Sequence, residues 1–415
     1  MDRGPAIAAP ETTSEETIDL RQTARVMVTA LAVGHVAFHW IIQSFVVVLP
    51  EIQRTFGLNG VGVGGILTMR ELASGLVTLP GGVVVDMLRK WWGWLLAGCV
   101  AASGLGSLLM GISPVYPLLL LGVAVVAVSH SLWHLPASAS LSHHFASRRG
   151  VMLSFHGVGG SVGDVAGPLI TGALLLVMGW RGILSIYAVA PFFMGFMAVW
   201  AFRGIGGVNE GDTEPAGLAE RLAMTKTLFR SPLLWGLTVV RGLRSMALVA
   251  LVTLLPLYLG NDLELGVFNR GFHISMLIAI GLLAKPLAGM VSDKLGRKQV
   301  LVPGLVWSCI FALLLIVFED GVTLTITIAL LGLFLYPDQP ILTAALFDVV
   351  GREVATTGLG VVSFVSFLMA AASPLIAGAL YEWKGFDAGL YYIAVLFALA
   401  AVLFAILPLS RRIEV

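Results

Sequence analysis

Charged residues are scarce in this chain of 415 residues, where Asp, Glu, Lys and Arg together make up 12%. Soluble proteins carry roughly 25% of such residues, whereas 58% of this sequence is hydrophobic. A chain with so little charge cannot cover a water-facing surface, so we expect most of its surface to face lipid. The net charge is only +1, which gives no electrostatic reason to expect a nucleic-acid partner.

Cysteines and enzyme motifs are also scarce. The two cysteines, Cys99 and Cys309, lie inside apolar segments, where we expect small packing residues and no disulfide or reactive thiol. The sequence has no Walker-type nucleotide loop and no nucleophile–base or metal-hydrolase motif. We therefore expect no enzymatic activity, no cofactor and no bound metal, and an ion gradient in place of ATP as the energy source. Residues 1–23 are polar and lack the apolar core of a signal peptide, which predicts a disordered cytoplasmic tail.

Long apolar runs are what the sequence has instead, and each is long enough to cross a bilayer as a helix. Twelve runs are found, at 24–49, 61–84, 92–112, 115–142, 150–177, 182–202, 232–259, 270–291, 299–318, 322–346, 354–381 and 388–409. An even number of spans places both termini on the same side of the membrane. That side holds 17 Lys and Arg residues in its loops and tails against 4 on the opposite side. The positive-inside rule then predicts an inner or plasma membrane protein with both termini cytoplasmic.

Proline positions indicate an internal duplication. Pro50 pairs with Pro256, Pro80 with Pro286 and Pro168 with Pro374, each at an offset of 206 residues. The surrounding text agrees, because "GPLITGALL" at 167–175 matches "SPLIAGALY" at 373–381. We therefore predict two six-helix bundles, 24–202 and 232–409, joined by a cytoplasmic linker at 203–231 and followed by a short tail at 410–415. This is the parallel-repeat plan of a transporter whose halves rock about a site near the bilayer midplane.

Two loops carry related charged motifs. The second half has "GMVSDKLGRK" with Gly289, Asp293 and Arg297, and the first half has "GVVVDMLRK" with Gly82, Asp86 and Arg89. Charges at such helix ends can bind the neighbouring half and release it, or they can merely mark the cytoplasmic side.

A third motif, "GDVAGPLITG", lies in the fifth span. Gly159, Gly163 and Gly167 fall four apart, so another helix can approach this face closely. Pro168 is expected to bend the helix, either as a flexible point or as a static kink used for packing.

These motifs resemble those of the major facilitator superfamily, and the resemblance covers the chain from about residue 24. Stretch 134–176, with "HLPASAS", "SFHGVGG" and "GPL", is most similar to the fosmidomycin-resistance branch of its drug-efflux members. The resemblance implies an all-α integral membrane fold of twelve transmembrane helices in two pseudo-symmetric halves. It also implies a central cavity lined by helices one, four, seven and ten. In this family the loop usually reads G-x-x-x-D-R-x-G-R-R/K. The first-half loop lacks the second glycine and the first arginine of that pattern, which suggests a looser latch there.

Ionisable side chains inside the spans are expensive and mark functional sites. They include His35, His39, Arg70, Glu71, His130, His134, His156, Asp164, Arg241, Arg244 and Asp338. Adjacent helical residues point about 100° apart, so we expect Arg70 and Glu71 to face different partners. Desolvation favours the neutral form of Glu71, which makes Glu71 the first candidate for proton coupling and Asp164 the second. Arg70 would then pair with Asp164 or with an anionic substrate, although a purely structural ion pair is the alternative.

The expected substrate-binding groups are His35, His39, Arg70, His130, His134, Arg241, Arg244 and Asp338. Arg241 and Arg244 lie three apart on one helix face and form a fork suited to a carboxylate or phosphonate. Alternatively, one of the two is a latch to Asp338. The histidine pairs are polar packing residues or ligands. Metal transport is disfavoured because no cysteine or methionine cluster and no acidic ring joins them.

The sequence as a whole predicts a monomeric secondary transporter that works by alternating access. We expect proton-coupled export of a small anionic or amphipathic organic compound. Uptake of an organic anion such as a monocarboxylate is the first alternative. A non-transporting membrane sensor or membrane-embedded enzyme on the same scaffold is the second, and lipid flipping is the third. Substrate identity, direction, coupling ion and stoichiometry do not follow from the sequence.

Overall fold

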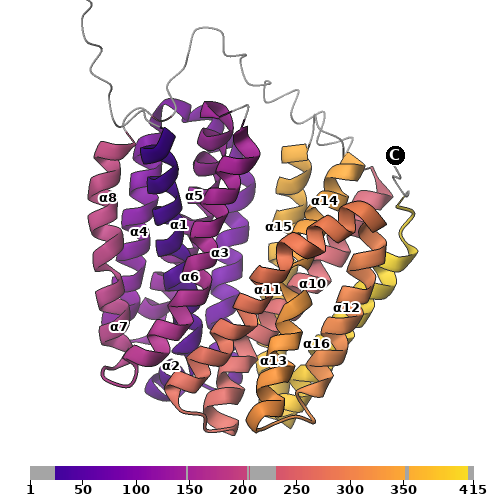
Figure 1. The fold of residues 1–415 in the computed structure, drawn as a ribbon. Coiled ribbons are helices and arrows are strands. Elements are labelled where there is room, and N and C mark those ends of the chain that lie inside the picture. The colour runs from indigo at the N-terminus through magenta and orange to yellow at the C-terminus, as the bar shows by residue number, and fades with distance from the viewer. Residues whose placement is uncertain (1–23, 146–147, 203–204, 206–229, 351–354, 410–415) are drawn as a thin grey trace, which may run out of the picture.

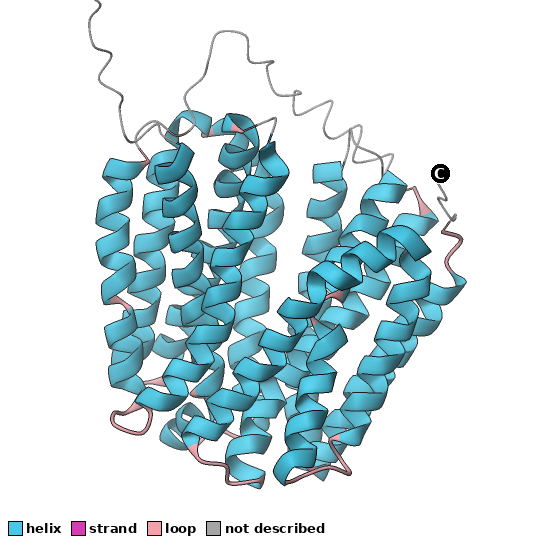
Figure 2. Cartoon of the chain, viewed as in Figure 1, coloured by secondary structure: helices cyan, strands magenta, loops and turns pink. Residues whose placement is uncertain are grey.

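The computed structural model describes residues 24–145, 148–202, 205, 230–350 and 355–409. These residues form helices and loops, with no strand among them (Figure 2). The helices of the first half are α1 (Ala24–Val47), α2 (Leu49–Phe56), α3 (Gly60–Met87), α4 (Trp92–Ile112), α5 (Tyr116–His144), α6 (Arg149–Leu174), α7 (Trp180–Tyr187) and α8 (Val189–Ala201). Those of the second half are α10 (Pro232–Leu257), α11 (Val267–Leu295), α12 (Arg297–Leu314), α13 (Gly321–Leu335), α14 (Asp338–Val350), α15 (Ala355–Lys384) and α16 (Phe386–Ile406).

Two pairs of helices, α7 with α8 and α13 with α14, each form one broken span, so each half contributes six membrane-crossing units. Every apolar run expected from the sequence overlaps one of these units, which confirms the twelve-helix, all-α fold. Within the described residues, ten units are long and apolar enough to span a membrane by length and composition. The two outside that set are α3 and α6, which carry Arg70, Glu71, His156 and Asp164. The expected tails, 1–23 and 410–415, lie outside the described residues, as does the linker 203–231 except for 205, 230 and 231.

Local chemistry explains several helix ends. The α10 helix begins with Ser231 as its N-cap, whose hydroxyl accepts a bond from the Leu234 N–H, and Pro232 follows in the first turn. Gly296, with φ 105°, separates α11 from α12, a conformation that favours glycine. The short α2, which follows α1 directly, was not expected from the sequence. It ends at Gly57, with φ 61°.

The two bundles meet through α3 packed on α15 and α6 packed on α11. The 206-residue offset exchanges these two interfaces, since it carries α3 onto α11 and α6 onto α15. At equivalent places the carbonyl oxygens of Pro168 and Pro374 lie so close to Gly271 and Gly64 that a side chain would clash. The duplication seen in the sequence is therefore also a duplication of the interface.

The bundles diverge toward the end where α1 begins and α16 ends, here called the terminal end (Figure 1). They converge at the opposite end, here called the far end, where α2 lies and α11 begins (Figure 1). One apolar cluster joins the halves there, with Leu49 and Ile52 packed with Val249 and Leu257. One large core fills the second half and also takes in Val46 and Val47 of α1, and another core lies within the first half.

Candidate functional site

Four histidines from two helices meet inside the first half. His35 and His39 come from α1, and His130 and His134 come from α5, four residues apart in each case. The Nε2 atoms of His130 and His134 are 2.9 Å apart, and those of His39 and His130 are 3.4 Å apart. The four residues, here called the histidine cluster, each offer one ring nitrogen within 4.8 Å of the others. Sequence spacing placed each pair on one face but gave no sign that the two faces oppose each other.

Two of these rings are held by α6. The Nδ1 of His35 lies 2.7 Å from the carbonyl oxygen of His156, whose ring stacks on the His35 ring at a centroid distance of 4.2 Å. The Nδ1 of His39 lies 2.8 Å from the Asp164 carboxylate, which also accepts a bond from Gln43 at 3.1 Å. A carbonyl or carboxylate oxygen only accepts. Both Nδ1 atoms must therefore be donors, which leaves the lone pair of each neutral ring on its Nε2.

Arg70 and Glu71 pair with each other, so the expectation that they face different partners is wrong. The Nε and an Nη of Arg70 lie 2.9 and 2.8 Å from one carboxylate oxygen of Glu71. The Cα–Cβ bonds of neighbouring helical residues do diverge. The Arg70 side chain is nevertheless long enough for its guanidinium group to fold back and reach the Glu71 carboxylate. Glu71 is buried and Arg70 is partly buried. The pair supplies its own charge balance, and Asp164 is bound to His39 and Gln43 instead.

Arg244 also has a partner in this conformation. Its Nε donates to Asp338 at 2.6 Å, and an Nη donates to the carbonyl of Leu335 at 2.5 Å. Both side chains are almost completely buried, at 5% and 2% exposed. Asp338 opens α14 directly after the break at Tyr336 and Pro337, so the interrupted helix aims a carboxylate and a free carbonyl at Arg244. The latch that the sequence offered as an alternative is thus the arrangement observed.

Arg241 lacks the ion pair that Arg244 makes. Its one hydrogen bond joins it to the Thr343 hydroxyl at 3.4 Å, and no carboxylate pairs with it among the described residues. The two arginines therefore do not act as a free fork here. Of these two arginines, only Arg241 lacks an ion pair with a carboxylate of the described residues.

Lys285 is an intramembrane cation that the sequence reasoning did not single out. It lies in α11, directly before Pro286, and is partly buried. Its charge interacts with those of Asp164 from the first half and Asp338 from the second. The signal was present in the sequence as a lysine inside an apolar run. Its proximity to charges of both halves could not be known without the packing of α6, α11 and α14.

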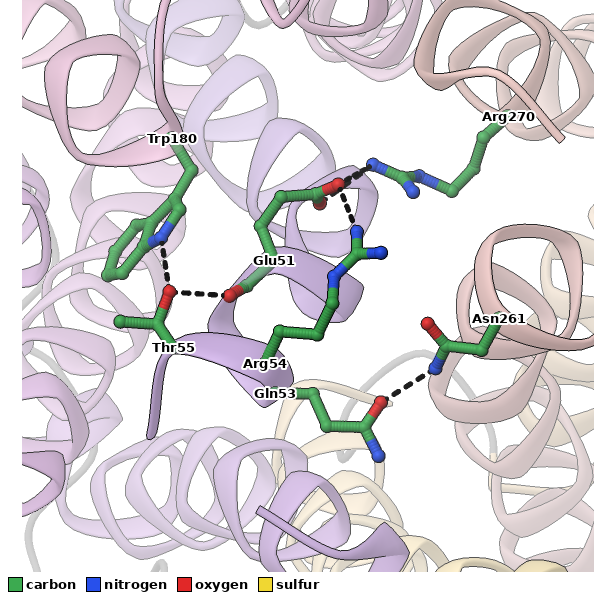
Figure 3. Close-up of polar contacts among 7 residues, drawn as sticks. All are labelled: Glu51, Gln53, Arg54, Thr55, Trp180, Asn261 and Arg270. Carbon is green, nitrogen blue, oxygen red and sulfur yellow. Dashed lines mark hydrogen bonds and ion pairs between the residues drawn. The ribbon is translucent and has the colours of Figure 1, made fainter. Parts of the chain in front are cut away.

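A second set of polar contacts joins the halves at the far end and was also missed (Figure 3). Glu51 of α2 accepts two bonds of 2.7 Å from Arg270 of α11, and a further bond of 2.9 Å from Arg54. Gln53 accepts a 2.7 Å bond from Asn261. Arg270 is 1% exposed, so its charge depends on Glu51. We call Glu51, Gln53, Asn261 and Arg270 the far-end gate. The sequence placed these residues in loops, where no partner can be inferred.

The charged motif of the second half makes its contacts within that half. Arg297 pairs with Asp293, donates to the Ser292 hydroxyl at 3.1 Å and contacts Asp348 of α14 at 3.3 Å. The space beside Gly289 is open. In the first half, a 3-10 turn over Arg89–Trp91 replaces the glycine turn, with the Arg89 guanidinium over the Trp92 ring. The side chain of Asp86 and the surroundings of Gly82 lie outside the described residues.

The glycine face of α6 packs on α1 as expected. At Gly159, Gly163 and Gly167 a side chain would meet the α1 backbone near Ala32, Val36 and Trp40. This close approach is what lets His39 reach Asp164. Pro168 lies inside α6 without ending it.

Comparison with known proteins finds relatives of nearly full length. The chain is 24% identical to the membrane sensor protein UhpC of Escherichia coli over 91% of this chain and 92% of that one. It is 23% identical to the fosmidomycin resistance protein of E. coli over 66% of each chain.

Among solved structures, an inward-facing, unoccupied bacterial homologue of the human lysosomal transporter Spinster superimposes with a TM-score of 0.78. The identity is 15%, with 92% of this chain and 96% of that chain covered, so this likeness shows the fold. The model of the Major Facilitator Superfamily matches residues 31–284 and 271–414, and the chain is therefore a multi-pass membrane protein of the Major Facilitator Superfamily.

Proposed function

We propose that this protein is a secondary transporter that exports a small anionic or amphipathic organic compound in exchange for protons, by alternating access. Its two bundles would rock about the polar groups at mid-depth, with the far-end gate closed in the conformation described here. No catalytic step is part of the proposal.

The excess of positive charge inside the spans carries the proposal. Four cationic side chains, Arg70, Arg241, Arg244 and Lys285, lie there beside three carboxylates, Glu71, Asp164 and Asp338. Two carboxylates are bound by arginines, and Asp164 is bound by His39. Arg241 and Lys285 thus have no carboxylate within ion-pair distance among the described residues. A buried cation is costly unless paired, and an anionic substrate would supply the missing partner when bound.

The proton half of the proposal rests on the carboxylates of the first half. Glu71 is buried and accepts a hydrogen bond from Arg70. Asp164 instead accepts a hydrogen bond from the imidazole of His39. Both can exchange protons, which the arginines cannot. The similarity to a fosmidomycin resistance protein favours export. Similarity to a membrane sensor keeps a non-transporting sensor as the second candidate, and import of an organic anion is the third.

A ligand screen followed by a transport assay separates these functions. A compound that binds the folded state raises its thermal stability, by about 2.7 kcal/mol at a concentration of 100 Kd. Organic acids, phosphonates and cationic drugs would be screened on the purified protein in this way. We expect an anionic hit, and proteoliposomes should then show it moving against an imposed proton gradient. A stabilising anion that is never transported would support the sensor.

The orientation has its own test. We propose that both termini lie in the cytoplasm of a cell with this protein in its inner or plasma membrane, because Lys and Arg concentrate on that side. Reporter fusions at residue 215 and at the C-terminus should both report the cytoplasm, and one near Asp262 should report the exterior. A cytoplasmic signal at 262 would overturn the span assignment.

A further inference from the structure

We propose that the histidine cluster is a binding site for one divalent transition-metal ion of the Zn²⁺ class. His35, His39, His130 and His134 each offer one ring nitrogen, and these four atoms lie within 4.8 Å of one another. They come from two neighbouring helices at i, i+4 spacing, so each helix supplies two ligands from one face.

The spacing of the nitrogens fits a tetrahedral ion. A Zn–N bond of about 2.0–2.1 Å gives a ligand-to-ligand edge of about 3.4 Å in a tetrahedron. Two Nε2 contacts in the cluster measure 2.9 and 3.4 Å. The largest separation, 4.8 Å, exceeds the tetrahedral edge by about 1.4 Å. Rotation of the imidazoles about their side-chain bonds would have to close that difference when the ion binds.

The outer hydrogen bonds prepare two of the rings for a metal. Histidine ligands commonly donate their second N–H to a carbonyl or carboxylate, which fixes the tautomer and raises the basicity of the ligating nitrogen. His35 does so to the carbonyl of His156, and His39 does so to Asp164. Each bond leaves the Nε2 of that ring with the lone pair that a metal needs, and the Nε2 of His39 lies 3.4 Å from that of His130.

His35 gives an independent sign that something is missing from the cluster. The residue is 7% exposed, and its Nε2 has no hydrogen-bond partner among the described residues. A buried acceptor without a partner is destabilising. A metal ion in the cluster would give this nitrogen a partner and would replace the contacts among the other three Nε2 atoms.

The donor set selects the class of ion. Four imidazoles suit Zn²⁺, Cu²⁺ or Ni²⁺, whereas Mg²⁺ and Ca²⁺ require oxygen ligands. The carboxylate of Asp164 offsets part of the added charge, and the nearby Arg70 is already paired with Glu71. The His39 side chain is 23% exposed, which leaves the ion a path into the site. Sequence reasoning disfavoured a metal for want of cysteines or an acidic ring, but four converging imidazoles need neither.

The test is direct binding to the purified full-length protein, with its affinity tag removed. Zn²⁺ would be titrated by calorimetry, and Co²⁺ would serve as a spectroscopic probe because tetrahedral Co²⁺ absorbs strongly in the visible. We expect one Zn²⁺ per chain and a tetrahedral Co²⁺ spectrum. His130→Gln and His35→Gln should each weaken Zn²⁺ binding by at least about 100-fold. Asp164→Asn, which changes only an outer partner, should weaken it by about 10–100-fold.

His273→Gln is the matched control, because His273 is a buried histidine of α11 that bonds to Asn269 and Thr325, outside the cluster. It should bind Zn²⁺ as tightly as the wild type. Thermal unfolding of every variant, with and without Zn²⁺, separates a lost ligand from a lost fold. Failure of the folded wild type to bind Zn²⁺ or Co²⁺ would overturn the proposal. Equal binding by wild type and the cluster variants would also overturn it, since the ion would then sit elsewhere.

Discussion

The cores of the two halves descend from one repeat but hold different chemistry. The offset of 206 residues carries His35 of the first half onto Arg241 of the second. Around His35 lie four more histidines, His39, His130, His134 and His156, and Asp164 bonds to His39; imidazole and carboxyl groups are kinds that can exchange protons. Around Arg241 lie Arg244, Asp338 and Thr343, and the arginines stay charged at any physiological pH. This contrast supports a division in which the first half handles protons and the second half holds an anion.

The charged loops of the two halves also differ from each other. The second half turns at Gly296 and binds Arg297 to Asp293 and Asp348, whereas the first half replaces the glycine turn with a 3-10 turn. At the far end the halves are tied by charge, through Glu51 and Arg270. Among the described residues, the ion pair between the halves therefore lies at the far end in this conformation, and Arg297 pairs within its own half.

The largest effect is expected from Glu71→Gln, which removes the buried carboxylate of the first half while keeping its shape. Arg70 can still donate to the amide oxygen, so the protein should fold. We expect proton-driven transport to be abolished in proteoliposomes, and Asp164→Asn to have the next-largest effect. Transport by Glu71→Gln with a normal pH profile would make Glu71 structural and move the proton route to the histidines.

Arg244→Ala tests whether the second half depends on its buried ion pair. Removing one partner strands the Asp338 carboxylate, which costs about 3–5 kcal/mol of stability at a buried site. Thermal unfolding in detergent should show the loss. The double variant Arg244→Met with Asp338→Leu should recover most of it, because apolar residues of similar size replace such pairs well. If Arg244→Ala is as stable as the wild type, the pair is not structural and Arg244 is free for substrate.

Arg241→Ala should affect binding instead of folding, because Arg241 has only a hydroxyl partner in the described part of the chain. Loss of one partner of a desolvated charge pair costs about 2–5 kcal/mol in binding, or roughly 30-fold or more in affinity. Lysine should rescue poorly if the contact is bidentate. The affinity of the anion found by the stability screen would be measured for each variant. A neutral or cationic ligand that binds wild type and Arg241→Ala equally well would contradict the anion hypothesis.

Glu51→Gln is expected to have the smallest effect, by loosening the far-end gate. A hydrogen bond to a charged group contributes about 1.5–3 kcal/mol, so amide hydrogen exchange in α2 and the start of α11 should speed up by about tenfold or more. Arg54→Gln is the control, because its side chain is 60% exposed and its pair with Glu51 lies within α2. Equal exchange in both variants would show that Arg270 does not hold the gate closed.

Much of the fold follows from the sequence because a chain that spans a lipid bilayer must form long apolar helices. The duplication follows from the prolines that recur at an offset of 206 residues. Contacts between helices are harder to predict. Spacing along α1 and α5 showed two histidine pairs, but only the packed bundle shows that they face each other. The Arg70–Glu71 pair could not be predicted from the directions of the Cα–Cβ bonds. The Arg70 side chain is long enough to fold back onto Glu71 although those bonds diverge. Glu51 and Arg270 were missed because loop residues 219 positions apart carry no local signal of their pairing.

The division between the halves is tested most directly by calorimetric titration of the anionic ligand in buffers of different ionisation enthalpy. This titration gives the affinity and the number of protons exchanged on binding in one experiment. The account predicts that Arg241→Ala loses affinity by roughly 30-fold or more but exchanges the same number of protons as the wild type. It predicts that Glu71→Gln keeps its affinity and exchanges fewer protons. Normal proton exchange by Glu71→Gln, or undiminished affinity in Arg241→Ala, would contradict the account.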